Sequence, residues 1–140
     1  MKRIHSAYLS IIIALLLNTI SCSKKFEDCN ESLYLKNNSQ SSIYYATTLK
    51  DGFLNYDPSN PTYASDYKIG ASQTQKVRIG ITLSCWEQVI ESADGYLYIY
   101  IYDAETLESE GWDNTKNKPL KKYNLTAKNL SQMKWTVVYP

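Results

Sequence analysis

The chain has 140 residues and a formal net charge of +1 at pH 7, and 44% of its residues are hydrophobic. The near-neutral balance of 15 basic and 14 acidic side chains gives no electrostatic basis for binding nucleic acid or anionic lipid. Its only histidine, His5, lies close to the N-terminus. Beyond that segment, the sequence therefore excludes Ser-His-Asp and Cys-His mechanisms and every metal site that uses histidine.

The N-terminus has the pattern of a secretory signal peptide. Lys2 and Arg3 precede an apolar run over residues 11–17, and small or polar residues lead to Ser21 and Cys22. The apolar run is too short to span a bilayer comfortably, so we do not predict a transmembrane anchor.

Residues 19–22 (Thr-Ile-Ser-Cys) resemble the bacterial lipobox, in which the cysteine is lipidated and becomes the mature N-terminus. We predict a lipoprotein signal peptide over residues 1–21, and a lipidated Cys22 with a polar tether over residues 22–31. Each buried methylene of an acyl chain contributes about 0.8 kcal/mol, so two or three chains would hold the protein firmly on a membrane. The alternative is an ordinary cleaved signal peptide, with Cys22 discarded or left unmodified.

Residues 32–140 suit a single domain that opens with two short strands. Residues 32–36 alternate in character and end at the turn-prone run 37–39, and residues 42–48 are rich in β-branched and aromatic side chains. We predict that these two strands form a hairpin.

The stretch from Lys50 to Gln73 is the least regular part of the domain. Asp-Gly and Asp-Pro-Ser-Asn-Pro turn sequences interrupt it, and it carries Tyr56, Tyr63 and Tyr67. Long loops are often functional, and tyrosine combines an apolar ring with a polar tip. These three tyrosines are the candidate binding residues. The alternative is that they pack down onto the edge of the sheets.

The middle of the chain holds the strongest strand signals. Residues 74–83 alternate, with apolar side chains from Val77 to Leu83 facing inward, and a short helix follows from the Ser-x-x-Glu sequence at residue 84. In residues 95–103, Leu and Ile alternate with Tyr, and neither face carries a charge until Asp103. This pattern predicts a central strand that is covered on both sides.

The last part of the chain mixes short helices and strands. The acidic run 103–111 predicts a turn or short helix, residues 120–124 a short strand, Thr126 a helix N-cap, and residues 133–139 a last strand. We count six or seven strands with two or three short helical turns. The fold class predicted is mainly β, an antiparallel β-sandwich of the Ig-like or transthyretin-like type.

Beyond Cys22, the domain contains one further pair of cysteines, Cys29 and Cys85. In an oxidising envelope an even pair most simply forms a disulfide, which would constrain the unfolded chain by about 4 kcal/mol. Two separate buried thiols are the alternative. We predict no metal site, because two cysteines distant in sequence and without histidine do not complete a zinc site.

Several stretches carry a resemblance to a known family: residues 35–39 (Leu-Lys-Asn-Asn-Ser), 85–87 (Cys-Trp-Glu), 100–108 (Tyr-Ile-Tyr-Asp-Ala-Glu-Thr-Leu-Glu) and 122–126 (Lys-Tyr-Asn-Leu-Thr). Over most of its mature region the chain resembles small, uncharacterised lipoproteins of gut Bacteroidetes. Relatives favour Phe where this chain has Tyr98, Tyr100 and Tyr102, which implies burial. The resemblance implies a place in the cell envelope, as an outer membrane lipoprotein on the periplasmic or the surface face, and supplies no catalytic residues.

Three functions remain open. The first is a membrane-anchored, non-enzymatic binding or interaction module for an envelope protein or glycan, and the second is a structural accessory lipoprotein without a ligand site. The third is a small hydrolase, because glycosidases need only two carboxylates. The acidic run offers Asp103, Glu105, Glu108 and Glu110, although dense exposed carboxylates are usually solvated surface. We favour the binding module and expect neither enzyme activity, nor a cofactor, nor a nucleic-acid partner.

Overall fold

The computed structural model of the chain describes residues 29–79 and 85–140. The predicted signal peptide, Cys22 and most of the predicted tether lie outside these ranges, as do the last residues of the strand predicted over 74–83. Among the helices in the part of the chain that is described, none is long and apolar enough to cross a membrane.

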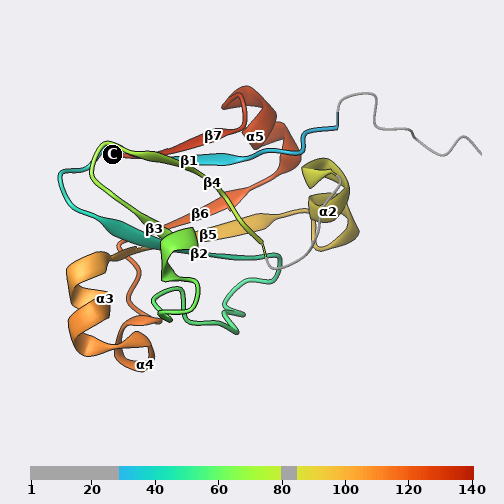
Figure 1. Cartoon of the computed structure of the whole chain (residues 1–140). Helices are drawn as coiled ribbons and strands as arrows, with labels where there is room; N and C mark the ends of the chain where they lie inside the picture. Colours follow the sequence, from blue (N-terminus) through green and yellow to red (C-terminus); the bar gives the residue numbers. More distant parts are fainter. Residues whose placement is uncertain (1–28, 80–84) are drawn as a thin grey trace, which may run out of the picture.

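Seven strands in the described ranges form two sheets, which Figure 1 shows as two layers. In the smaller sheet, the order is β4 (Thr74–Lys76), β1 (Tyr34–Asn37) and β7 (Thr136–Tyr139). In the larger sheet, the order is β3 (Lys68–Ile69), β2 (Ile43–Thr48), β5 (Leu97–Asp103) and β6 (Lys121–Leu125). Neighbouring strands are antiparallel except β1 and β7, which are parallel. The β-rich class and the mostly antiparallel pairing agree with the antiparallel arrangement predicted from the sequence, and the parallel β1–β7 pair is the exception to it.

The predicted hairpin of the first two strands is also wrong, because β1 and β2 belong to different sheets. The side chain of Asn37, at the end of β1, is completely buried. Its Nδ2 donates to the backbone oxygens of Ser41 and Gly70, at 2.8 and 3.1 Å, and its Oδ1 accepts from the backbone N–H of Ser39 at 3.0 Å. These bonds fix a chain reversal that carries the backbone from one layer to the other instead of back along β1.

The central position of β5 was predicted correctly. Leu97, Ile99 and Ile101 are completely buried on one face, and Tyr100 and Tyr102 are buried on the other. The Tyr100 hydroxyl donates to Asp51 Oδ1 at 2.7 Å and accepts from the backbone N–H of Gly52 at 2.9 Å. The Tyr102 hydroxyl donates to the backbone oxygen of Lys116 at 2.9 Å. Tyr100 and Tyr102 are therefore covered by the loop after β2 and by the chain that follows β5, with their hydroxyl groups satisfied by hydrogen bonds, whereas Tyr98 is half-buried.

Short helices close the two ends of the sheets (Figure 1): α2 (Trp86–Ser92) and α5 (Ala127–Gln132) lie at one end, and α3 (Ala104–Glu110) and α4 (Trp112–Thr115) at the other. Thr126 is the N-cap of α5 as predicted, and it forms a reciprocal capping box with Asn129. The α4 turn was not predicted, because residues 112–118 are mostly polar. It forms where the Trp112 ring packs edge-on against the Tyr102 ring, with centroids 5.2 Å apart.

Candidate functional site

The irregular segment between β2 and β3 is ordered by short-range side-chain hydrogen bonds. Asp57 Oδ1 accepts from the backbone N–H and the hydroxyl of Ser59, at 2.8 and 2.7 Å, and Asn60 Oδ1 accepts from the backbone N–H of Thr62 at 3.0 Å. A short 3-10 turn, η1 (Ala64–Asp66), follows. Polar residues at these positions thus bend the chain repeatedly, and its tyrosines return to the sheet.

The three predicted binding tyrosines converge around one ring. The centroid of the Tyr67 ring lies 5.1 Å from that of Tyr56, 5.8 Å from that of Tyr63 and 5.4 Å from that of Tyr45 on β2. Tyr67 is 9% exposed, whereas Tyr56 and Tyr63 are half-buried. The backbone of Tyr67 also accepts from the N–H of Tyr45 at 3.0 Å, which holds the cluster against the strand.

This cluster forms one wall of an open cavity of about 480 Å³, which we call the tyrosine pocket. Its lining side chains are aromatic, aliphatic or neutral polar: Thr47, Thr48, Leu49, Phe53, Asn55, Tyr56, Tyr63, Tyr67 and Ile79. Among these described lining residues none is charged, and Phe53 is 56% exposed. The volume and the mostly apolar lining are typical of small-molecule and side-chain binding sites.

The tyrosines of the pocket have different tasks. The Tyr56 hydroxyl accepts from the backbone N–H of Thr47 at 2.7 Å, and burial raises the pKa of Tyr56 to about 12. Tyr56 therefore supports β2 beyond the end of β3, as well as lining the pocket. The Tyr63 hydroxyl has no hydrogen-bond partner among the residues that the structure describes. Tyr63 and the exposed Phe53 are thus the aromatic residues most available to a ligand.

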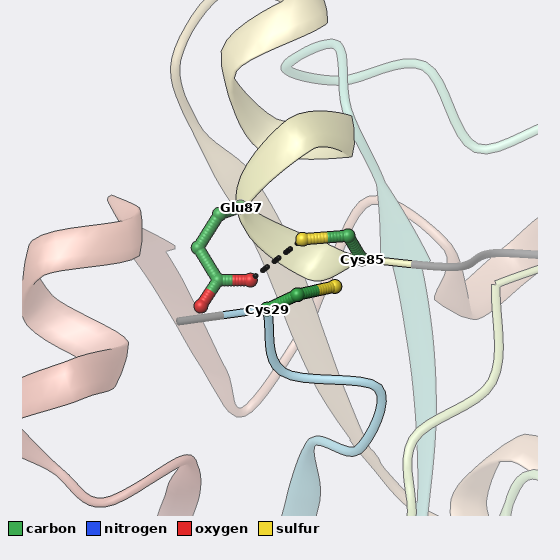
Figure 2. A group of neighbouring side chains, drawn as sticks. All are labelled: Cys29, Cys85 and Glu87. Atoms are coloured by element: carbon green, nitrogen blue, oxygen red, sulfur yellow. Dashed lines mark hydrogen bonds between the residues drawn. The ribbon is translucent and has the colours of Figure 1, made fainter. Parts of the chain in front are cut away.

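A second cluster lies where the N-terminal segment meets α2 (Figure 2). The sulfur atoms of Cys29 and Cys85 and a carboxylate oxygen of Glu87 all lie within 4.8 Å of one another; we call these three residues the cysteine corner. The thiol of Cys85 donates to Glu87 Oε2 at 3.2 Å. Cys85 and Glu87 are buried and Cys29 is exposed. The sequence predicted a disulfide between Cys29 and Cys85; the structure brings the two sulfurs to within 4.8 Å of each other but shows no disulfide bond between them.

Asn30 fixes the carboxylate of the cysteine corner. Its backbone N–H donates to Glu87 Oε2 at 3.0 Å, and its Nδ2 donates to Glu87 Oε1 at 2.6 Å. Burial alone would raise the pKa of Glu87, but the hydrogen bonds that its carboxylate accepts, first those from Asn30 and then those from its own backbone and Cys85, outweigh burial and hold this pKa below its usual value. The hydrogen bond with Cys85, partial desolvation and nearby negative charge together raise the pKa of the Cys29 thiol to about 11.

The predicted carboxylate group lies partly along a polar cleft of about 590 Å³, which Asp103, Glu105 and Glu108 help to line. Glu108 forms an ion pair with Lys68 at 2.6 Å and accepts from the Tyr44 hydroxyl at 2.9 Å, and these contacts lower its pKa. Asp103 caps α3 by accepting from Thr106, which lowers the pKa of Asp103 as well. The general acid of a glycosidase needs a raised pKa, so the lowered pKa values of Asp103 and Glu108 argue against that role.

Comparison with known proteins gives no relative: no protein-family model, no curated protein and no solved structure matches this chain. The tyrosine pocket and the cysteine corner are therefore the features from which a function can be inferred. Sequence reasoning found the three pocket tyrosines and the cysteine pair, and it missed Phe53 and Glu87. The sequence signal for Phe53 was an aromatic residue placed directly after the Asp51-Gly52 turn. The position of Glu87 two residues after Cys85 was visible, but only the fold brings Cys29 to it.

Proposed function

We propose that the chain is an envelope lipoprotein, anchored through Cys22, whose domain is a non-enzymatic module that binds a neutral ligand in the tyrosine pocket. The observation that carries this proposal is the convergence of Tyr56, Tyr63 and Tyr67 on one open cavity whose described lining carries no charge. The resemblance to Bacteroidetes lipoproteins and the lipobox-like residues 19–22 support the anchoring.

The lining of the pocket limits the ligand to a neutral molecule or group. A charged group that entered would lose water without finding a countercharge among the described lining residues, and such burial is unfavourable. Rings and short aliphatic groups fit, because Phe53 and Tyr63 offer apolar faces and the Tyr63 hydroxyl offers one polar contact. A neutral sugar ring or an apolar side chain of an envelope protein has this chemistry.

The two alternative functions have weaker support. Two of the carboxylates of the hydrolase alternative are already engaged: Glu108 pairs with Lys68 and Asp103 accepts from Thr106, and both have lowered pKa values. A structural accessory protein without a ligand site would account for the burial of Tyr67 and for the hydrogen bond of Tyr56. It gives no role to a Phe53 that is 56% exposed at the edge of the pocket.

For the finer fold type, we propose the transthyretin-like arrangement of the two sheets. In the Ig-like arrangement the first two strands share one sheet. Here β1 and β2 lie in different sheets, and β1 pairs with the last strand instead. The order of the strands therefore favours the transthyretin-like type over the Ig-like type.

Ligand-observed NMR tests the pocket, with the full chain in detergent and with neutral monosaccharides, their aromatic glycosides and N-acetylated leucine and tyrosine amides as probes. We expect saturation transfer to at least one of these probes with the wild type, and its loss in the double variant Phe53→Ala/Tyr63→Ala. The matched control is Tyr96→Ala/Leu120→Ala, which removes two side chains that are also exposed, at 43% and 54%, and that do not line the pocket.

Equal saturation transfer in the pocket variant and in the wild type would place binding elsewhere and overturn the proposal. Anchoring is tested separately with labelled palmitate in the native cell. We expect incorporation into the wild type and none into Cys22→Ser, and equal labelling of the two would refute Cys22 as the lipidated residue.

A further inference from the structure

The cysteine corner has a chemistry that the proposed binding function does not use. Two sulfurs and one carboxylate oxygen, contributed by the start of the domain and by the N-terminal end of α2, lie within 4.8 Å of one another (Figure 2). We propose that, in its reduced form, the corner binds one zinc-class divalent cation through Cys29, Cys85 and Glu87.

The donor set selects the class of ion. Two of the three donors are sulfur, which suits borderline and soft cations such as Zn²⁺ and Cd²⁺ and not the hard cations Ca²⁺ and Mg²⁺. Zn²⁺ accepts two thiolates and a carboxylate as three of its four ligands. The fourth position would face solvent, because Cys29 is exposed. The exposed Cys29 is also the route by which an ion reaches the buried Cys85 and Glu87.

The hydrogen bonds of the corner prepare it for a cation. The Cys85 thiol now points its proton at Glu87 Oε2, so a metal ion that displaces this proton finds a thiolate and a carboxylate already directed at each other. Asn30 holds both carboxylate oxygens through its backbone and side-chain N–H groups. Such outer hydrogen bonds orient metal ligands in known sites. Binding releases two thiol protons, and the divalent ion offsets two of the three negative charges of the two thiolates and the carboxylate, which leaves the site with a net charge of −1.

Oxidation would use the same two sulfurs for a different product. Oxidised glutathione, a disulfide, can accept the two electrons and two protons of Cys29 and Cys85 and leave as two glutathione thiols. The disulfide that forms keeps the cysteines joined and removes both as metal ligands. The corner can therefore hold a disulfide or a bound cation, but not both at once. Either one would link the N-terminal segment to the start of α2.

The test measures zinc and cadmium binding by the full chain with Cys22→Ser, so that Cys29 and Cys85 are its only cysteines. The protein is first reduced, and zinc affinity is measured by competition with a chromophoric chelator. We expect one Zn²⁺ per chain, and with Cd²⁺ an ultraviolet sulfur-to-metal charge-transfer band. Cys29→Ser and Glu87→Gln should each weaken zinc binding by at least about tenfold, and Asn30→Ala by about tenfold.

The control variant is Glu91→Gln, which removes an exposed carboxylate from the same helix and should leave zinc affinity unchanged. Cys29→Ser alters an exposed side chain, so circular dichroism should show an intact fold and make its loss of binding interpretable. Zinc affinity in Cys29→Ser equal to that of the parent would overturn the proposal. The proposal would also be overturned if the reduced chain bound no zinc while oxidised glutathione still formed the Cys29–Cys85 disulfide, because the corner would then be a disulfide site only.

Discussion

The tyrosine pocket and the cysteine corner differ in how the fold assembles them. Most side chains of the pocket come from one segment, residues 47–67, and are uncharged. The corner joins residues 56 positions apart, from Cys29 to Cys85, and its central group is a buried carboxylate. Local turns are enough to gather the pocket, whereas the corner requires the whole domain to fold. The pocket is therefore assembled mainly within one stretch of the sequence, and the corner depends on contacts between segments that are distant in the sequence.

The largest expected effect concerns Trp86, which lies between Cys85 and Glu87 and is 3% exposed. Its backbone N–H also donates to the backbone oxygen of Asn30 at 3.0 Å. The packing that holds the Trp86 ring therefore also holds the N-terminal segment of the corner in place. Trp86→Ala should lower the free energy of unfolding by about 3–5 kcal/mol, as is usual for large-to-small core changes. Urea denaturation measures it, with the exposed Leu120→Ala as control. A loss under about 1 kcal/mol would contradict this role of Trp86.

In the pocket, two tyrosine-to-phenylalanine changes should differ. Tyr56→Phe leaves the N–H of the buried Thr47 without its present acceptor and should cost about 1–3 kcal/mol of stability. Tyr63→Phe removes a hydroxyl that has no partner in the described part of the chain, and should change stability by less than about 0.5 kcal/mol. Thermal and urea unfolding of both variants tests the contrast. Equal costs would mean that Tyr56 has no special structural task.

The smallest expected effect is the pH dependence of folding stability that Glu87 of the cysteine corner contributes. Because the folded-state pKa of Glu87 lies below its ordinary value of 4.5, its carboxylate stabilises the folded state at neutral pH. This stabilisation is lost as the pH falls from about 4.5 through the folded-state pKa. The difference in urea midpoint between wild type and Glu87→Gln should therefore be present at pH 7 and shrink toward pH 3. A difference that grows on acidification would contradict the assigned direction.

The strand content and the burial of the central strand followed from the sequence alone. Alternation of aliphatic and tyrosine residues over 97–102, without a charge, can be satisfied only by cover on both faces, and β5 has it. The N-cap at Thr126 likewise depends on residues within one turn of helix. Such features are local, so the chain pattern is sufficient to specify them.

The tertiary structure decided the rest. Nothing local in residues 34–48 shows that Asn37 would send β1 and β2 into different sheets, because its acceptors on Ile69 and Gly70 lie more than thirty residues away. The proximity of Cys29, Cys85 and Glu87 likewise comes from long-range packing. The sequence by itself determined which segments bury which faces, since that depends on side-chain periodicity. Only the folded chain decided which polar and sulfur groups meet, since that depends on how the layers are connected.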